Sequence, residues 1–452
     1  AHFCEHMLFL GTDTFPDPMS YDDFINRHGG SENAFTSEQV TVYYSELAKG
    51  SLAEGLDRFG DFFRAPRFNA SLVEKEIHAI DSEHAKNRQD PTWRILAVLN
   101  SLADPRSPLS RFHTGDMETL YTKPIAEGAD PVAALRTWFD AHYCPSRMDL
   151  VTFSSSPLEE QLADAEKYFG NISAKSQSCE AERPKSWAQP PPWPLERLGK
   201  WVPVLGTEPQ VEIILYFVLP ALTAEYRSQP GAFLGYVLSY GGEHSLLTTL
   251  RDDLGLVTGI STSFSTKSFA SVLMVNFGLT DNGKTRPERV LDVFFQYVGT
   301  LRHQQLSPGL YSSLAIAKRM SWDWSQHAAA SDTVMTLAED LTKFPPEDVL
   351  AGESVIESPD PELVMSLIMR LTPDAMNAAF VDPHVRFGPS ANVKVLPHYG
   401  VKYAVEDLQS RFGESMPRWQ RWLTHAGSRN SAAELRELLG SPGLAPPRPP
   451  TA

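Results

Sequence analysis

Cysteine is scarce in this chain, which has only Cys4, Cys144 and Cys179 among its 452 residues. Three thiols at such wide spacings do not make the disulfide framework that stabilises small secreted domains. The low cysteine content therefore predicts a reducing compartment, and we expect a cytoplasmic protein. A secretory leader stays compatible with the sequence, because Ala1 begins in the middle of a patterned stretch.

Long hydrophobic runs and surplus basic charge are also missing. The most apolar stretches, RILAVLNSLA and IILYFVLPAL, end well short of the roughly 18 residues that span a bilayer. Against 56 acidic residues stand 40 basic ones, a formal charge of −16. Nucleic acids and anionic membranes both require a basic face. We therefore expect neither as a partner, whereas positively charged peptides would be attracted. The alternative is that the net negative charge only keeps a large protein soluble.

A hydrophobic content of 42% and the length of the chain indicate a large core shared by two or more domains. Between the two predicted domains, proline, serine and charged residues interrupt the periodic pattern of apolar residues. Proline and glycine dominate the C-terminal end of the sequence. The predicted organisation is a first domain at 1–180, a Pro-rich linker at 181–198, a second domain at 199–438 and a Pro-rich tail at 439–452.

Helical and strand patterns follow one another irregularly in both blocks. MSYDDFINRHGG predicts a helix, NAFTSEQVTVYYSEL predicts strands, LVEKEIHAIDSEHAKNRQ predicts a long helix and MDLVTF predicts a short strand. The second block repeats the order in VEIILYFVL, GAFLGYVLSY, VTGISTSF, SVLMVNFGL and the amphipathic PERVLDVFFQYVGTLRHQ. The expected fold class is α+β, with two similar domains, each a mostly antiparallel sheet packed with helices.

The candidate chemistry begins at the first residues, AHFCEHMLFL. His2 and His6 stand four residues apart, so a helix places both imidazoles on one face, with Glu5 beside them. This is the His-x-x-Glu-His spacing of inverted zincins. Catalytic zinc requires a third protein ligand.

Spacing alone leaves that third ligand open. Glu76 and Glu83 lie seven residues apart on one helical face, and either carboxylate could approach the first helix. His78 and His84 on the same segment are alternatives. The alternative to any metal site is a solvated, charged helix face, because the His-x-x-Glu-His motif fixes only three residues and also occurs by chance.

Four linked stretches carry a family resemblance: HFCEHMLFLGT, GGSENAFTSEQVTVYY, EKEIHAIDSEHAKN and FHTGDMETL. In order and spacing they resemble the insulysin branch of the pitrilysin family of inverted-zincin metallopeptidases. The similarity continues through PGAFLGYVLSYGGEHSLLTTLRD to WQRW and matches only the N-terminal half of that family's long members.

The resemblance implies roles residue by residue. It implies one Zn²⁺ in the catalytic domain, held by His2, His6 and Glu83, with Glu5 as general base and no other cofactor. Glu76 is implied as a supporting residue that orients a ligand histidine. Substrate-contacting positions are implied at Asn33, Ala34, Phe35, Phe9 and Trp93; for Phe9 and Trp93, core packing is the alternative. The segment 239–261 departs from the family's peptide-anchoring pattern, so a helix-to-strand connection is its alternative.

The family also implies half of a peptidase chamber. A C-terminal half, in the same chain or in a second subunit, would supply further residues to the site, and strands ahead of the zinc helix would complete the first sheet. The expected function is a zinc metalloendopeptidase that hydrolyses peptides of small to moderate size, with homodimerisation as a further expectation. The alternative is a non-catalytic or partner-dependent half-subunit that binds peptides or a second subunit.

Overall fold

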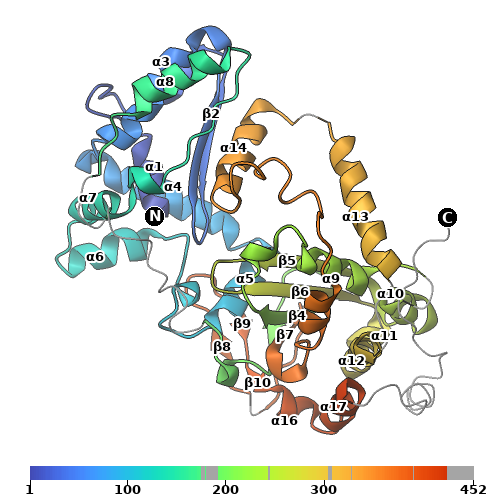
Figure 1. Ribbon diagram of the computed structural model, residues 1–452. Coiled ribbons are helices and arrows are strands. Elements are labelled where there is room, and N and C mark those ends of the chain that lie inside the picture. The colour runs from blue at the N-terminus through green and yellow to red at the C-terminus, as the bar shows by residue number, and fades with distance from the viewer. Residues whose placement is uncertain are drawn as a thin grey trace. The chain divides into compact units, whose positions relative to one another are not determined.

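The computed structural model describes residues 1–174, 179, 192–242, 245–303, 308–326, 328–389 and 391–424. The chain forms two compact units, each made from three separate segments (Figure 1). Unit 1 contains Ala1–Asn87, Phe112–Lys185 and Gln326–Leu350, and unit 2 contains Arg88–Arg111, Ser186–Ser325 and Ala351–Ala452. Most of the predicted linker 181–198, and the whole tail 439–452, lie outside the described residues.

The continuous domains expected from the sequence, 1–180 and 199–438, are corrected at two segments. Helix α5 (Pro91–Ser101) belongs to unit 2, where it packs near strand β7 (Met376–Asp382). Helix α14 (Ala330–Leu341) belongs to unit 1, where it packs against strand β2 (Thr41–Glu46). A proline-rich stretch marks a change of composition, but packing decides which unit each helix joins.

Unit 1 is mainly helical and carries a two-stranded antiparallel sheet. Its further elements are α1 (His2–Leu8), α2 (Ser20–Arg27), β1 (Ser31–Thr36), η1 (Lys49–Ser51), α3 (Leu52–Arg64), α4 (Ala70–Asn87), η3 (Glu118–Thr122), α6 (Lys123–Ala126), α7 (Pro131–His142), η4 (Pro145–Arg147) and α8 (Leu158–Phe169).

The hairpin of unit 1 follows directly from its sequence. Strand β2, TVYYSE, is rich in β-branched and aromatic residues, and Thr36 of β1 lies opposite Thr41 at the turn. Gly29, with φ of +66°, follows α2, as expected for the glycine pair after that helix. The predicted helix, hairpin and long helix α4 are therefore confirmed.

The strand predicted from MDLVTF at 148–153 is wrong. Residues 148–153 have no regular secondary structure, and within the described chain no strand pairs with them. A strand needs a neighbour for its backbone hydrogen bonds, and β propensity alone does not supply one.

The core of unit 1 gathers around α1, α4 and an aromatic group that includes Phe62 and Phe63. Cys4, Met7 and Leu8 of α1 are fully buried in it. Cys144 and Cys179 form a disulfide, while Cys4 is a free buried thiol. The low cysteine count excluded a framework of several bridges, and the single bridge is compatible with that expectation.

Unit 2 is built on an eight-stranded sheet. Its further elements are η2 (Pro108–Ser110), η7 (Leu195–Arg197), β3 (Lys200–Leu205), β4 (Glu212–Leu219), η8 (Thr223–Glu225), α9 (Pro230–Ser239), α10 (Leu246–Thr248), η9 (Thr249–Asp253), β5 (Val257–Thr266), β6 (Ser271–Leu279), α11 (Asp281–Lys284), α12 (Pro287–His303), α13 (Pro308–Asp323), α15 (Pro361–Ile368), η10 (Pro373–Ala375), β8 (Lys394–Val395), β9 (Lys402–Tyr403), β10 (Glu406–Asp407), α16 (Leu408–Phe412) and α17 (Met416–Thr424).

The strand order is β5-β6-β4-β7-β3-β9-β8, with β10 also paired to β3. Among the described strands only β3 and β7 run parallel, and the other pairings are antiparallel. Helices α9, α12 and α17 pack with this sheet around one large apolar core (Figure 1). The predicted α+β class, with mostly antiparallel sheets and packed helices, is confirmed.

A buried ion pair lies inside the core of unit 2. Both carboxylate oxygens of Asp292 accept from Arg418 Nη2, at 2.6 and 2.7 Å, and Trp419 Nε1 donates to Oδ1 at 2.6 Å. Asp292 is only 4% exposed, so these donors replace the water that it loses on folding.

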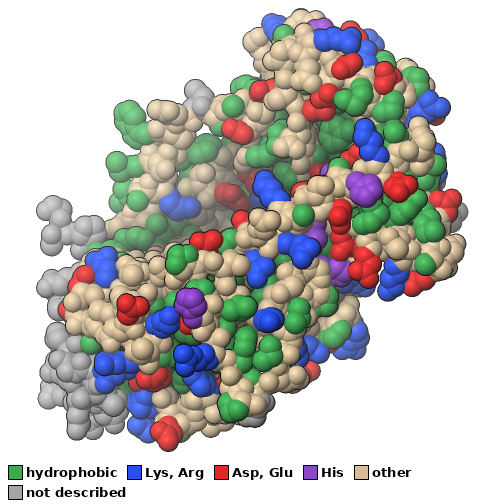
Figure 2. Space-filling model, turned by 180° about the vertical axis from the view of Figure 1, so that it is seen from behind, with side chains coloured by type: hydrophobic (Ala, Val, Ile, Leu, Met, Phe, Trp, Pro, Cys, Tyr) green, Lys and Arg blue, Asp and Glu red, His purple; other side chains and the backbone are tan. Residues whose placement is uncertain are grey.

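The surface is of mixed character. On the face shown in Figure 2, hydrophobic side chains lie among acidic and basic ones. Among the described helices, none is both long enough and apolar enough to span a bilayer.

Candidate metal centre

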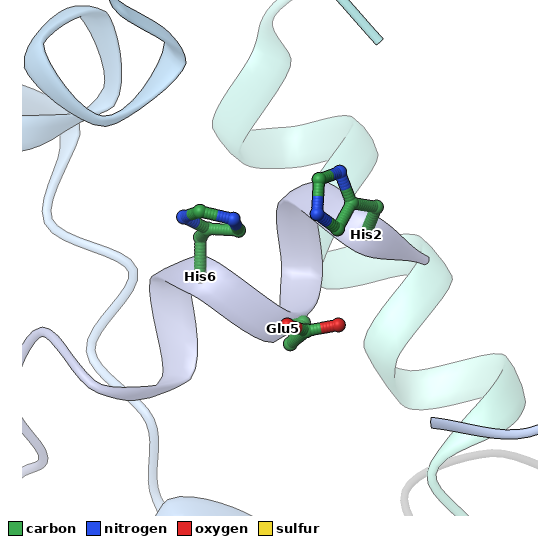
Figure 3. A group of neighbouring side chains, drawn as sticks. All are labelled: His2, Glu5 and His6. Atoms are coloured by element: carbon green, nitrogen blue, oxygen red, sulfur yellow. The ribbon is translucent and has the colours of Figure 1, made fainter. Parts of the chain in front are cut away.

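Helix α1 separates apolar from polar side chains along its seven residues. Cys4, Met7 and Leu8 enter the core, while both histidines remain partly exposed. Figure 3 shows the imidazoles of His2 and His6 on one side of α1, with Glu5 on the turn between them. The ligand-capable atoms of these three residues lie within 4.8 Å of one another.

A carboxylate from α4 joins the two imidazoles. Glu83 Oε2 lies 3.3 Å from His2 Nε2 and 3.6 Å from His6 Nε2. In a tetrahedral zinc site with bonds of about 2.0–2.1 Å, two ligand atoms are roughly 3.3 Å apart. Glu83 Oε2 therefore lies from each Nε2 atom at about the distance that separates two ligands of a single zinc ion.

The other nitrogen of each imidazole is already engaged. His2 Nδ1 lies 2.7 Å from the Thr114 carbonyl oxygen, and His6 Nδ1 lies 2.7 Å from Glu76 Oε1. Both partners accept hydrogen bonds, so Nδ1 carries the proton in each ring and the lone pair of neutral imidazole is on Nε2. Both Nε2 atoms face Glu83, which is the arrangement that a metal requires.

The charges of the group favour a cation. Burial disfavours imidazolium at His6, but hydrogen bonds with Glu76 and Glu83 raise its pKa to about 9. Hydrogen bonds with His2 and His6 hold the pKa of Glu83 well below its ordinary value. Three carboxylates, from Glu5, Glu76 and Glu83, thus accompany two imidazoles, and a divalent cation would offset the excess negative charge.

Glu5 has a different environment from Glu83. It is 6% exposed, and its Oε2 accepts a hydrogen bond from Thr36 Oγ1 at 2.5 Å. Burial raises the pKa of Glu5, while the bond from Thr36 acts in the opposite direction. A partly desolvated carboxylate beside a metal site suits a group that takes up and releases a proton.

The alternative ligands on α4 have other surroundings. His78 is exposed, and the ring of His84 is buried and packs edge-on against Phe112, with centroids 4.6 Å apart. Of the four candidates on α4, the structure brings Glu83 to the Nε2 atoms and Glu76 to the outer nitrogen of His6.

The predicted substrate-contacting residues have varied positions. Asn33, Ala34 and Phe35 lie in β1, which pairs with β2 along one edge; within the described residues the other edge has no partner strand. Phe9 packs against Tyr21, Tyr43 and Phe62 in the aromatic core. Trp93 belongs to α5 in unit 2 and is 44% exposed.

Sequence reasoning missed Thr36 and Thr114, which contact Glu5 and His2. Thr36 follows the Asn33–Phe35 triplet in β1, so the alternation of that strand could have drawn attention to it. Thr114 acts through its backbone carbonyl, for which a side-chain pattern gives no indication.

Three models of one peptidase family match successive parts of the chain. "Insulinase (Peptidase family M16)" matches residues 1–106, "Peptidase M16 inactive domain" matches 131–314, and "Middle or third domain of peptidase_M16" matches 322–431. The metal-binding candidates on α1 and α4 fall within the first of these.

Individual relatives agree with this result. The chain is 31% identical to "Putative zinc protease mug138" of Schizosaccharomyces pombe over 92% of its own length and 42% of that protein. It is 29% identical to the insulin-degrading enzyme of Homo sapiens over 93% of this chain and 40% of that one. The chain thus spans well under half of the relatives it matches.

Among solved structures, a crystal structure of pitrilysin superimposes with a TM-score of 0.84. The match covers 94% of this chain and 44% of that chain at 24% identity, so it supports the fold. Taken with the three models that together match most of the sequence, these likenesses show that the chain belongs to peptidase family M16, with insulin-degrading enzymes among its relatives.

Proposed function

We propose that unit 1 is the catalytic part of a zinc metalloendopeptidase that hydrolyses peptides of small to moderate size. The observation that carries the proposal is the convergence of His2 Nε2, His6 Nε2 and Glu83 Oε2 at ligand-to-ligand distances, with Glu5 beside them. The membership of family M16 supports a peptidase role.

One Zn²⁺ would be held by His2, His6 and Glu83, with Glu76 and the Thr114 carbonyl orienting the two imidazoles. A zinc ion so held supplies a Lewis acid, which acidifies a water molecule and polarises a peptide carbonyl. The donor set suits zinc, since imidazole nitrogen and carboxylate oxygen are both usual zinc ligands.

Glu5 performs the proton transfers in this proposal. Its carboxylate accepts a proton from the attacking water as the new carbon–oxygen bond forms. The same carboxyl group then gives that proton to the amide nitrogen as the carbon–nitrogen bond breaks. The second proton of the water passes from the new carboxyl group to the amine, so the products are a carboxylate and a protonated amine, and Glu5 returns to its ionised state.

The open edge of β1 is the proposed binding site for the substrate backbone. An extended peptide that pairs with Asn33, Ala34 and Phe35 would be held by main-chain hydrogen bonds, which tolerate varied sequences. The formal charge of −16 favours peptides that carry positive charge. The roles of Phe9 and Trp93 at the cleaved bond stay predictions.

Because the chain spans well under half of its relatives, further parts of a peptidase chamber are part of the proposal. A C-terminal half in the same chain, or a second subunit, would complete the enclosure, and homodimerisation stays a prediction. The cytoplasmic location also stays a prediction, and the Cys144–Cys179 bridge weakens the cysteine argument for it.

A second candidate is a non-catalytic or partner-dependent subunit that binds peptides without hydrolysing them. The observation that favours it is the match of residues 131–314 to a domain described as inactive. The presence of Glu5 together with all three ligand candidates favours the enzyme, because a subunit that only binds has no need of a general base.

The test compares the natural protein that contains this chain with its Glu5→Gln variant. We expect both to bind zinc in equal amounts, and the variant to cleave a quenched fluorescent peptide about 10²- to 10⁴-fold more slowly. Glu127→Gln, at an exposed position, is the control that should keep full activity. Equal cleavage by wild type and Glu5→Gln would contradict the proposal, and zinc-loaded wild type without any cleavage would favour the binding subunit.

A further inference from the structure

Thr36 makes the closest contact of the Glu5 carboxylate with another side chain. Its Oγ1 donates to Glu5 Oε2 at 2.5 Å, and Glu5 is 6% exposed. A carboxylate so deeply placed has few water molecules to hold it in a fixed rotamer. The hydroxyl therefore takes on the task of restraining the rotation of the Glu5 side chain.

A second threonine holds the first. Thr36 and Thr41 lie directly opposite each other in the β1–β2 hairpin, and their Oγ1 atoms are 3.0 Å apart. An ionised carboxylate can only accept, so the single hydroxyl proton of Thr36 is directed to Glu5. Thr41 must then donate to Thr36, which gives a hydrogen-bond chain in one direction: Thr41 to Thr36 to Glu5.

This hydrogen-bond chain passes through β1 and therefore connects the strand mechanically to Glu5. Thr36 directly follows Asn33, Ala34 and Phe35, the residues proposed to pair with the substrate backbone. The strand that would bind the peptide thus also holds one oxygen of the base. Any displacement of β1 along its axis would move the Thr36 hydroxyl and, with it, the carboxylate.

We propose that Thr36 is a positioning residue for Glu5, supported by Thr41, and that it couples the substrate-binding strand to the orientation of the base. This inference rests on the proposed peptidase function. It assigns Thr36 no contact with the substrate or the metal, so removing its hydroxyl should slow turnover without weakening substrate binding or zinc binding.

The test uses variants that separate the hydroxyl from the shape of the side chain. Thr36→Val keeps the β-branch and the strand propensity but removes the donor, whereas Thr36→Ser keeps the donor. In the natural protein that contains this chain, we expect Thr36→Val to lower kcat about 10²-fold with little change in KM, because misplaced catalytic groups cost about that much. Thr36→Ser should retain most of kcat, and Thr41→Val should give a smaller loss than Thr36→Val.

Zinc content and thermal unfolding are measured for every variant and should match the wild type. Ser31→Ala is the matched control, since Ser31 belongs to the same strand but to its opposite face. Combining Thr36→Val with Glu5→Gln should cause no loss beyond that of Glu5→Gln alone, because both changes act through the same group.

Three results would overturn the inference: full kcat in Thr36→Val, an equal loss in Thr36→Ser, or additive losses in the double variant. These outcomes are distinct from a failure of the proposed function. That failure would appear as full activity in Glu5→Gln, whatever the Thr36 variants do.

Discussion

The two units balance the charges of their clustered carboxylates in opposite ways. In unit 2, Asp292 is matched by Arg418 and Trp419, and its charge is balanced within the core. In unit 1, Glu5, Glu76 and Glu83 face two imidazoles, and negative charge remains in excess. One cluster is complete as a structural ion pair, and the other has the composition of a cation site. The difference shows that buried charge by itself does not identify a functional site; the balance of charge does.

The units also differ in what stabilises them. Unit 2 has the eight-stranded sheet and fully buried aromatic side chains such as Phe217, Phe277 and Phe294. Unit 1 has a two-stranded hairpin, exposed Phe153 and Leu158, and all three cysteines of the chain. We infer that unit 2 relies on apolar burial, whereas unit 1 depends more on its disulfide.

The largest expected effect comes from unbalancing the cluster of unit 2. Asp292→Ala would leave Arg418 without its buried partner and should lower the free energy of unfolding by about 3–5 kcal/mol. Chemical denaturation followed by tryptophan fluorescence measures this, since Trp419 contacts Asp292 directly. Asp281→Ala, at an exposed position, is the control, and zinc content should stay unchanged in both.

If Asp292→Ala were as stable as the control, the ion pair of unit 2 would contribute nothing to the fold. The contrast between a structural cluster and a functional one would then lose its basis.

The next effect concerns the disulfide of unit 1. The bridge spans a sequence separation of 35, for which loop-closure entropy predicts about 3–4 kcal/mol of stabilisation. The double variant Cys144→Ser and Cys179→Ser should therefore lower the stability of unit 1 by about that amount. The matched control is Cys4→Ser in a separate variant, which tests a buried thiol without a bridge.

Differential scanning calorimetry under oxidising and reducing conditions checks this prediction. Reduction of the disulfide should lower the stability of the wild type as much as the double substitution does. The stability of the double variant should be the same under oxidising and reducing conditions. A wild type that is insensitive to reduction would show that unit 1 does not depend on the bridge.

A smaller effect is expected for the supporting carboxylate of the site. Glu76→Gln keeps an acceptor for His6 Nδ1 but removes its charge, and should weaken zinc binding about 10- to 100-fold. Glu74→Gln, on an exposed part of the same helix, should leave zinc affinity unchanged. Competition with a chromophoric chelator measures both affinities, and equal values would remove Glu76 from the metal centre.

The smallest effect depends on pH. Burial, followed by the nearby charge of Asp22, raises the pKa of Glu32 to about 7, and Glu32 Oε2 has no hydrogen-bond partner among the described residues. A folded-state pKa above the unfolded value means that protonation favours the folded state, so stability falls as pH rises from about 4.5 to 7. Because the side chain is only half-buried, we expect Glu32→Gln to stabilise the protein by about 1 kcal/mol at pH 8.

The gain from Glu32→Gln should disappear near pH 4, where the wild-type carboxyl is protonated in both states. Glu118→Gln, at an exposed position, should show no such pH dependence. Denaturation curves at the two pH values measure the difference, and a gain of equal size at both would contradict a titration of Glu32.

Much of the candidate site could be predicted because helical spacing is a local property. The four-residue step from His2 to His6 places their rings on one face in any α-helix, and the structure has them there. Glu83 could not be chosen over His78, His84 or Glu76 by spacing, because the choice depends on how α4 packs against α1. The family resemblance supplied that tertiary information.

Other features depended on contacts that a pattern does not encode. Cys144 and Cys179 approach each other only through the fold, so the pairing could not be read from their spacing. Phe9 joins the aromatic core, as the packing alternative allowed. The β-like run at 148–153 has no neighbouring strand among the described residues, and its propensity therefore misled the prediction.

The distance along the chain between α1 and α4 has a consequence for biosynthesis. At about 5–20 residues per second, roughly 4 to 15 seconds separate the synthesis of His6 from that of Glu83. During that interval a nascent chain would present two imidazoles without the carboxylate. Two imidazoles alone bind copper more tightly than zinc by the usual order of metal affinities. The docking of α4 is therefore the step that completes the proposed ligand set, and contact with copper before that step is the hazard that this order of synthesis creates.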